Sequence, residues 1–109
     1  MNKINKSRRF GGVHGLCILV KKNIAKHCTI ISDTISDSTL WLLIDKHVLS
    51  FSFVIGGVYM PNESSIHYHN ELFDNLTDDI ITINSSHGVP IILFGDFNSR
   101  TGISIFHRI

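Results

Sequence analysis

Short apolar runs separated by polar links dominate the first part of the chain. Residues 15–20 and 27–31 are apolar and rich in β-branched side chains, and the polar link 21–26 lies between them. Two such runs around a polar link predict a β-hairpin. The polar stretch 32–39 that follows predicts a loop.

Two further apolar runs follow this loop. The continuous run 40–44 is typical of a strand covered on both faces, and 45–47 is expected to be its turn. Residues 51–59 then alternate between Phe or Ile and smaller or polar side chains before a Gly-Gly pair. Because the two runs are neighbours along the chain, we expect them to pair.

A change of hydrophobic period after residue 61 predicts an amphipathic helix of about four turns. The apolar positions recur at steps of three and four residues: Tyr68, Leu72, Leu76, Ile80 and Ile83. The positions between them are polar: Glu71, Asp74, Asn75, Asp78 and Asp79. Ser64 or Ser65 is a candidate N-cap, residues 85–88 are expected to break the helix, and 91–94 is a buried strand.

A strand, a crossing helix and a second strand form an α/β unit, whose chemistry is expected at the carboxyl ends of the strands. One strand ends at 58–62 and the other ends at 95–98. At the second end, Asp96 and Asn98 would aim a carboxylate and a carboxamide at one phosphate. Taken alone, Gly95 and Asn98 are also ordinary turn formers, and Tyr59 could be a core tyrosine.

Four segments in order resemble the endonuclease/exonuclease/phosphatase superfamily, especially the apurinic-type endonuclease domains of LINE-like (non-LTR) retrotransposons. They are Gly-Gly-Val at 11–13, Leu-Trp-Leu at 40–42, Val-Tyr-Met-Pro-Asn at 58–62 and Gly-Asp-Phe-Asn-Ser-Arg-Thr-Gly at 95–102. The resemblance covers residues 10–102. It implies a partial four-layer α/β sandwich, deoxyribonuclease I-like, with a mixed sheet and one clear helix.

The resemblance also implies roles for single residues. Asp96 would orient and deprotonate the attacking water, and Asn98 would bind the phosphate and steady its charge. Tyr59 and Asn62 would contact the scissile phosphate. Mg²⁺ is the expected cofactor because the candidate ligands are hard oxygens. DNA is the expected substrate, and a reverse transcriptase domain in the same parent polyprotein is a possible partner.

Departures from the family pattern concern the metal and the last catalytic group. The family places a metal-binding Glu upstream of the Gly-Gly opening, whereas Glu63 and Glu71 both lie downstream. No Asp follows Asp96, and His107 stands alone where an Asp-His pair is expected. We therefore expect a central fragment, a partial domain over 10–109 after a basic tail at 1–9, with no metal ligand assigned and no activity of its own.

Composition limits the classes of function. The 109 residues are 43% hydrophobic and 17% charged, which predicts one domain with a core. Ten basic and nine acidic residues give a net charge of +1, so any contact with DNA must be local. No apolar run reaches the roughly 18 residues of a membrane span, and no membrane partner is expected.

Histidines and cysteines add little to this picture. His67 and His69 point to different faces of a helix start, so they are expected on the surface rather than as a metal pair. Cys17 and Cys28 would face each other in the predicted hairpin and are expected as buried free thiols, in a reducing intracellular setting, nuclear or cytoplasmic.

Two classes of function remain open. The first is part of a metal-dependent phosphodiesterase that nicks target DNA. The second is a degenerate or mispredicted fragment that acts at most as an interaction module. A variant of the first keeps the fold and replaces DNA with an RNA or phospholipid phosphodiester.

Overall fold

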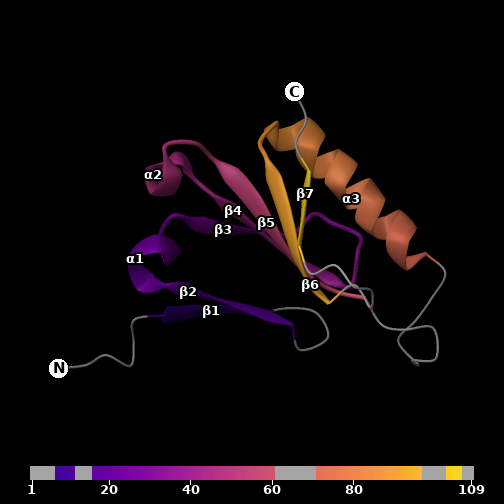
Figure 1. Ribbon diagram of the computed structural model, residues 1–109, viewed down its shortest axis with the longest axis horizontal. Helices are drawn as coiled ribbons and strands as arrows, with labels where there is room; N and C mark the ends of the chain where they lie inside the picture. The colour runs from indigo at the N-terminus through magenta and orange to yellow at the C-terminus, as the bar shows by residue number, and fades with distance from the viewer. Residues whose placement is uncertain (1–6, 12–15, 61–70, 97–102, 107–109) are drawn as a thin grey trace.

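The computed structural model describes residues 7–11, 16–60, 71–96 and the backbone of 103–106 (Figure 1). The elements in chain order are β1 (Ser7–Gly11), β2 (Cys17–Lys21), α1 (Lys22–Ala25), β3 (Cys28–Ile31), β4 (Thr39–Ile44), α2 (Lys46–Leu49), β5 (Phe53–Tyr59), α3 (Leu72–His87), β6 (Ile91–Asp96) and β7 (Ile103–Phe106). One sheet has the order β3-β4-β5-β6-β7, and β1 and β2 form a second, two-stranded sheet. The fold is mixed α/β, as predicted.

β4 and β5 pair at the centre of the sheet, which confirms the prediction that the two apolar runs are paired strands. The strands are antiparallel, with Thr39 opposite Val58 and Ile44 opposite Phe53. The predicted turn at 45–47 is wrong, because Asp45 caps a short helix, α2, by accepting a hydrogen bond from the backbone N–H of His47. The helix ends at Ser50 in the left-handed conformation (φ 73°), so β5 begins at Phe53, two residues later than predicted.

The predicted strand–helix–strand unit is confirmed. β5 and β6 are parallel neighbours, and α3 connects them along the chain. The helix was expected to break over 85–88, but α3 continues to His87, so the predicted break begins too early. The helix is capped by Gly88, whose φ of 61° suits glycine. The candidate caps Ser64 and Ser65 lie outside the described residues, but α3 begins at Leu72 with Glu71 at its N-cap, so the expected helix start is wrong. β7, which pairs with β6 antiparallel, was not predicted.

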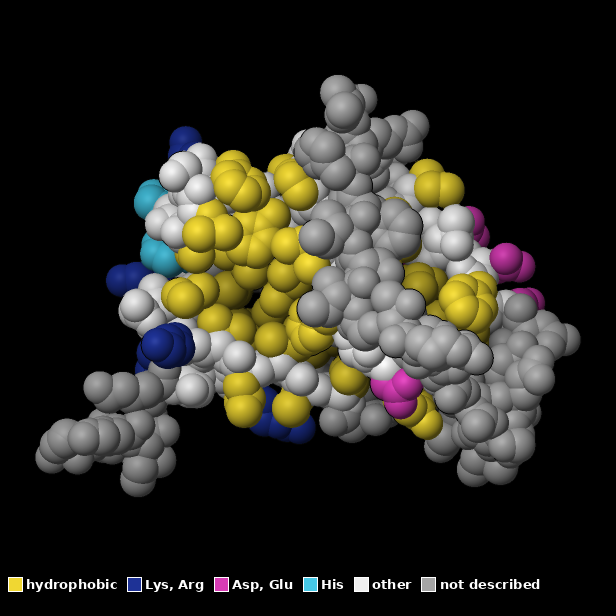
Figure 2. Space-filling view, in the orientation of Figure 1, with side chains coloured by type: hydrophobic (Ala, Val, Ile, Leu, Met, Phe, Trp, Pro, Cys, Tyr) yellow, Lys and Arg dark blue, Asp and Glu magenta, His cyan; other side chains and the backbone are white. Residues whose placement is uncertain are grey.

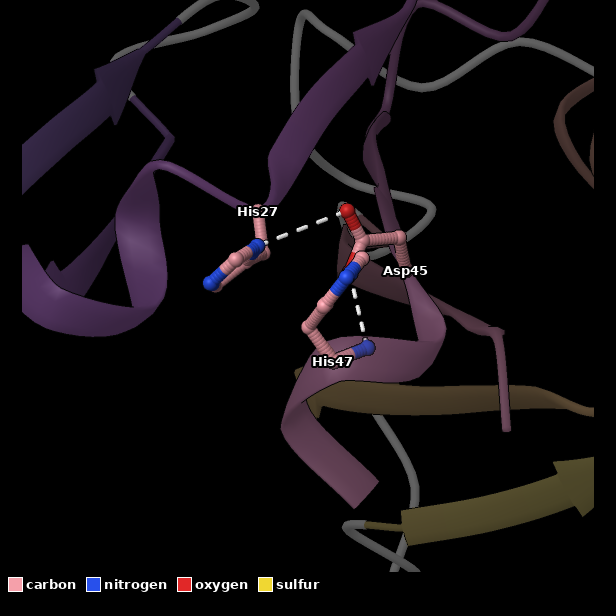
Figure 3. Close-up of side chains that lie close together, drawn as sticks. All are labelled: His27, Asp45 and His47. Atoms are coloured by element: carbon pink, nitrogen blue, oxygen red, sulfur yellow. Dashed lines mark hydrogen bonds and ion pairs between the residues drawn. The ribbon is translucent and has the colours of Figure 1, made fainter. Parts of the chain in front are cut away.

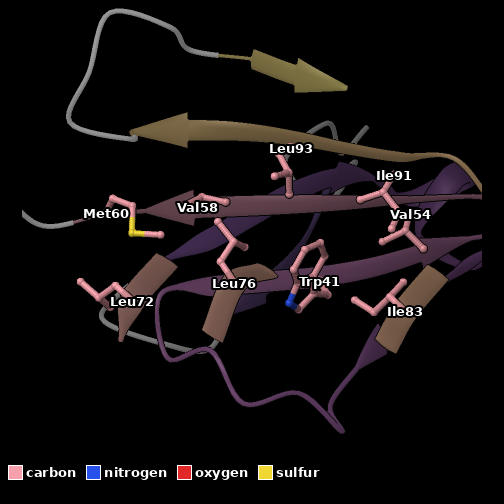
Figure 4. Packing of buried hydrophobic residues seen from close by; sticks show 9 residues of the cluster. All are labelled: Trp41, Val54, Val58, Met60, Leu72, Leu76, Ile83, Ile91 and Leu93. Atoms are coloured by element: carbon pink, nitrogen blue, oxygen red, sulfur yellow. The ribbon is translucent and has the colours of Figure 1, made fainter. Parts of the chain in front are cut away.

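The main core lies between α3 and one face of the five-stranded sheet (Figure 4). Its buried members are Trp41, Val54, Val58, Met60, Leu72, Leu76, Ile83, Ile91 and Leu93. The Trp41 ring lies over Gly56, where a Cβ atom would come within 2.6 Å of its Cζ3 atom. A glycine in β5 therefore makes room for the largest side chain of the core.

A second core lies on the other face of the sheet, under β1, β2 and α1. Phe10, Ile18 and Ala25 pack there with Leu40 and Leu42. The predicted hairpin of 15–20 with 27–31 is wrong, because β2 pairs with β1 and β3 pairs with β4. The link between β2 and β3 folds as α1 and buries Ala25 in this second core, so it is not a solvated hairpin tip.

This topology also separates the two cysteines. Cys17 pairs with Gly11 and is exposed, whereas Cys28 pairs with Ile44 and is half-buried. Both are free thiols, but the expected position opposite each other is wrong, and so is full burial. The predicted tail 1–9 contributes its last three residues to β1.

Asp79 has a different position from the one expected of a polar helix residue. Its side chain is 2% exposed, and its two carboxylate oxygens accept the backbone N–H groups of Ile35 and Ser36 at 2.9 and 2.8 Å. The carboxylate thus ties α3 to the loop before β4. The expectation that Asp79 faces solvent is wrong, because a partnered carboxylate can be buried.

Apolar side chains also reach the surface. They gather on the face shown in Figure 2, between the α1–α2 side of the molecule and β6. Large hydrophobic residues that are more than half exposed are Leu19, Ile35, Leu49, Phe51, Phe73 and Ile81. The described elements therefore cover the sheet and helix only in part.

Candidate functional site

The carboxyl ends of β5 and β6 lie side by side (Figure 1). The parallel register pairs Tyr59, the last residue of β5, with Asp96, the last residue of β6. The Met60 N–H donates to the Asp96 carbonyl at 2.7 Å, which extends the pairing past the end of the strand. Tyr59 is half-buried and Asp96 is exposed. We call this pair the strand-end site.

Gly95 sets the backbone just before Asp96. Its φ is +136°, and a Cβ atom there would lie 2.0 Å from the carbonyl oxygen of Val58. Only glycine accommodates both this φ and this close approach of β6 to β5. The glycine that sequence reasoning treats as a turn former therefore has a second role, which is to let the strands meet beside Asp96.

The strand-end site holds two of the four residues predicted from the sequence. Tyr59 and Asp96 occupy adjacent strand ends, as the α/β unit predicts, while Asn62 and Asn98 lie outside the described residues. Neighbouring strands are about 4.8 Å apart, so a phenol and a carboxylate on paired residues can reach one small ligand. The Asp96 carboxylate is a hard oxygen ligand that suits Mg²⁺, an ion that proteins hold through one or two carboxylates together with substrate phosphates.

A scan against protein-family models, a search of curated proteins and a search of solved structures each found no match to the chain. Family membership therefore remains a proposal. Among the residues that the structure describes, no helix is long and apolar enough to span a membrane.

A second group of polar side chains lies at the opposite end of the sheet. We call His27, Asp45 and His47 the histidine cluster (Figure 3). Asp45 Oδ1 lies 3.0 Å from His47 Nδ1, and Asp45 Oδ2 lies 3.5 Å from His27 Nδ1. The two imidazole rings are stacked, with centroids 5.0 Å apart and planes 13° from parallel.

Three elements position the histidine cluster. His27 directly precedes β3, Asp45 directly follows β4, and the Asp45 N–H donates to the His27 carbonyl at 3.0 Å. His47 follows on α2, where Asp45 is the N-cap. The cluster is therefore held by the β3–β4 pairing and by the cap of one helix.

The electrostatics of the histidine cluster favour an ionised Asp45. The pKa of Asp45 is lowered, first by the hydrogen bond from the backbone N–H of His47, with smaller contributions from the side chains of His47 and His27. Partial desolvation opposes this shift. A half-exposed carboxylate between two imidazoles can hold either a proton shared with histidine or a cation.

Sequence reasoning missed the histidine cluster. Asp45 and His47 are only two residues apart, but His27 is close to them only because β3 pairs with β4. The predicted hairpin gave residues 27–31 a different partner strand, which hid this contact. His67 and His69, which the sequence predicts as surface residues rather than a metal pair, lie outside the described residues.

Proposed function

We propose that the strand-end site is the phosphate-facing part of a divalent-metal-dependent phosphodiesterase site, of the type that nicks DNA in retrotransposon endonucleases. The observation that carries this proposal is the parallel register, which pairs Tyr59 with Asp96 at the carboxyl ends of β5 and β6. Ligand sites of open α/β sheets form at such ends. The resemblance of residues 58–62 and 95–102 to the endonuclease family supports the same assignment.

Each residue has a chemical task that suits its side chain. The Asp96 carboxylate accepts the proton of the attacking water, and exposure at the strand end leaves it accessible to that water. The Tyr59 phenol donates a hydrogen bond to a phosphate oxygen. The amides of Asn62 and Asn98 would donate to the same phosphate, as the resemblance implies. Mg²⁺, when bound, supplies positive charge against the charge that develops on the phosphate.

Binding of a phosphodiester is the direct test of this proposal. Amide NMR spectra of the 109-residue chain are recorded while a short DNA duplex is added with Mg²⁺. We expect shift changes centred on Tyr59, Met60 and Asp96, and a severalfold weaker response in Tyr59→Phe, which loses the phenol that donates to the phosphate. Asp78→Asn, at an exposed carboxylate on α3, is the control and should respond as the parent chain does. Shift changes that avoid the strand ends, or an unchanged response in Tyr59→Phe, would contradict the proposal.

The substrate class is tested in the same experiment. Parallel titrations use an RNA oligonucleotide and a phosphoinositide headgroup in place of DNA. If the strand-end shifts follow RNA or the headgroup rather than DNA, the phosphodiesterase assignment stands with a different substrate. If the shift changes fall on the exposed hydrophobic residues and not on the strand ends, the chain acts as an interaction module instead.

Catalysis by these 109 residues is not expected. The only glutamates, Glu63 and Glu71, lie downstream of the position of the family's metal ligand, and no Asp-His pair follows Asp96. Supercoiled plasmid incubated with the chain and Mg²⁺ should therefore remain supercoiled on an agarose gel. Nicking that disappears in Asp96→Ala would show that other residues replace the missing groups.

A further inference from the structure

We propose that the histidine cluster is a binding site for a divalent transition-metal ion, with Zn²⁺ as the best-matched ion. The site is separate from the strand-end site. Ile44 pairs with Phe53 at the first residue of β5, whereas Tyr59 is its last residue, so the two sites lie at opposite ends of this strand. The proposal does not depend on the proposed phosphodiesterase function.

The spacing of the ligand atoms is close to that of a metal centre. One ligand atom each from His27, Asp45 and His47 falls within 4.8 Å of the other two. Bonds of about 2.0–2.2 Å in a tetrahedral zinc site place neighbouring ligand atoms roughly 3.3–3.5 Å apart. The two carboxylate-to-imidazole distances are 3.0 Å, from Asp45 Oδ1 to His47 Nδ1, and 3.5 Å, from Asp45 Oδ2 to His27 Nδ1. Because the two imidazole rings are stacked, rotation of their side chains directs both nitrogens at one ion.

The ligand types select the class of metal. Two imidazoles and one carboxylate suit zinc and its neighbours in the first transition row, whereas Mg²⁺ and Ca²⁺ prefer sets of oxygen ligands. Three protein ligands also leave one coordination position for water, as in zinc sites of the two-histidine, one-carboxylate type. The histidine cluster is therefore a poor match for the Mg²⁺ expected at the strand-end site.

The cluster is both accessible and held in place. The His47 side chain is 65% exposed, the Asp45 side chain 45% and the His27 side chain 25%, so an ion can enter from solvent. Figure 2 shows histidine side chains at the molecular surface on the side of α1 and α2. The backbone hydrogen bond from Asp45 to His27 and the cap of α2 bring the ligands together before any ion binds. This preorganisation lowers the ordering cost of binding.

Titration of the metal-free 109-residue chain with Zn²⁺ tests this site. Isothermal calorimetry gives affinity and stoichiometry, and Co²⁺ serves as a visible-absorption probe of tetrahedral coordination. We expect His27→Ala and His47→Ala each to weaken binding by at least about tenfold, since even outer-shell partners of metal ligands have effects of that size. The matched control is His87→Ala, because His87 is exposed at the end of α3. This control should bind as the parent chain does.

A second variant separates ligand loss from misfolding. Asn is a good N-cap, so Asp45→Asn keeps the cap of α2 while it removes the charged ligand. We expect far-UV circular dichroism of this variant to match the parent chain while Zn²⁺ binding falls by about tenfold or more. Equal Zn²⁺ affinity in the parent chain, His47→Ala and Asp45→Asn would overturn the proposal. So would an equal loss in His87→Ala.

Discussion

Replacement of Gly95 by alanine should disrupt the end of β6, where it runs beside β5. The added Cβ atom would lie 2.0 Å from the Val58 carbonyl oxygen and 2.8 Å from the Val58 nitrogen. A carbon and a carbonyl oxygen in adjacent strands are ordinarily about 3.3–3.6 Å apart. The two strands must therefore separate by roughly 1.3 Å at this point, because the atoms that clash belong to the backbone.

The free energy of this change has two sources. A non-glycine residue at φ +136° costs about 1–3 kcal/mol of backbone strain. Separation of the strands also weakens the hydrogen bond from Met60 to Asp96, a loss of about 1 kcal/mol. We expect Gly95→Ala to lower the free energy of unfolding by about 3 kcal/mol. For a domain of this size, that corresponds to a melting temperature more than about 10 °C lower.

Gly57→Ala is the matched control for this measurement. Gly57 lies in β5 and pairs with Phe94, the residue before Gly95, but a Cβ atom there meets only side-chain atoms at 3.4 Å or more. Urea unfolding and thermal melts of the two variants are compared with the parent chain. Gly57→Ala should be neutral or slightly stabilising, because it restricts the unfolded chain. A Gly95→Ala variant within about 0.5 kcal/mol of the parent, or equal losses in both variants, would refute this reasoning.

Two further predictions concern the carboxylates. Asp79→Asn exchanges one of two buried acceptor oxygens for an amide NH2 group, so one N–H of Ile35 or Ser36 loses its partner. Urea unfolding should show a free energy of unfolding about 2–3 kcal/mol lower. Asp78→Asn, an exposed neighbour, should lose less than about 0.5 kcal/mol, and equal losses would contradict this role for Asp79. Asp45, whose pKa is lowered in the folded state, stabilises the chain above its ordinary pKa of 3.8, and this contribution disappears as pH falls below that value. Urea unfolding should therefore show the parent chain more stable than Asp45→Asn at pH 6 and the difference reduced near pH 2; a difference that is constant with pH would contradict it.

Sequence reasoning predicts well the elements whose buried positions recur with a regular hydrophobic period along the chain. The run 40–44 is continuous because both faces of β4 are covered, and the helix period reports one face of α3 packed on Trp41 and its neighbours. The carboxyl ends of β5 and β6 follow from this unit, so Tyr59 and Asp96 were placed together from sequence alone. The four-layer sandwich and the catalytic roles stay predictions.

The pairing error arises at β1, whose polar first residues resemble a solvated tail in the sequence. β2 pairs with β1, the strand immediately before it, rather than with β3, and the polar link 21–26 does not specify this choice. The histidine cluster was missed because the predicted hairpin separates β3 from its true partner, β4. Asp79 is different, because it stands on the same stripe as Leu72, Leu76 and Ile83 at helical spacing. That position in the stripe was a signal of burial, and only its charge favoured the solvent face.

Because Asp79 accepts hydrogen bonds from two loop amides, the hydrogen exchange of these amides depends on the position of α3. The N–H groups of Ile35 and Ser36 precede β4 and lie outside every strand, where amide protons ordinarily exchange with water quickly. Both donate to a side chain that α3 carries into the core. Their deuterium uptake should therefore be slow and should rise together whenever α3 detaches from the sheet. In this chain, two loop amides measure how often the crossover between the parallel strands opens.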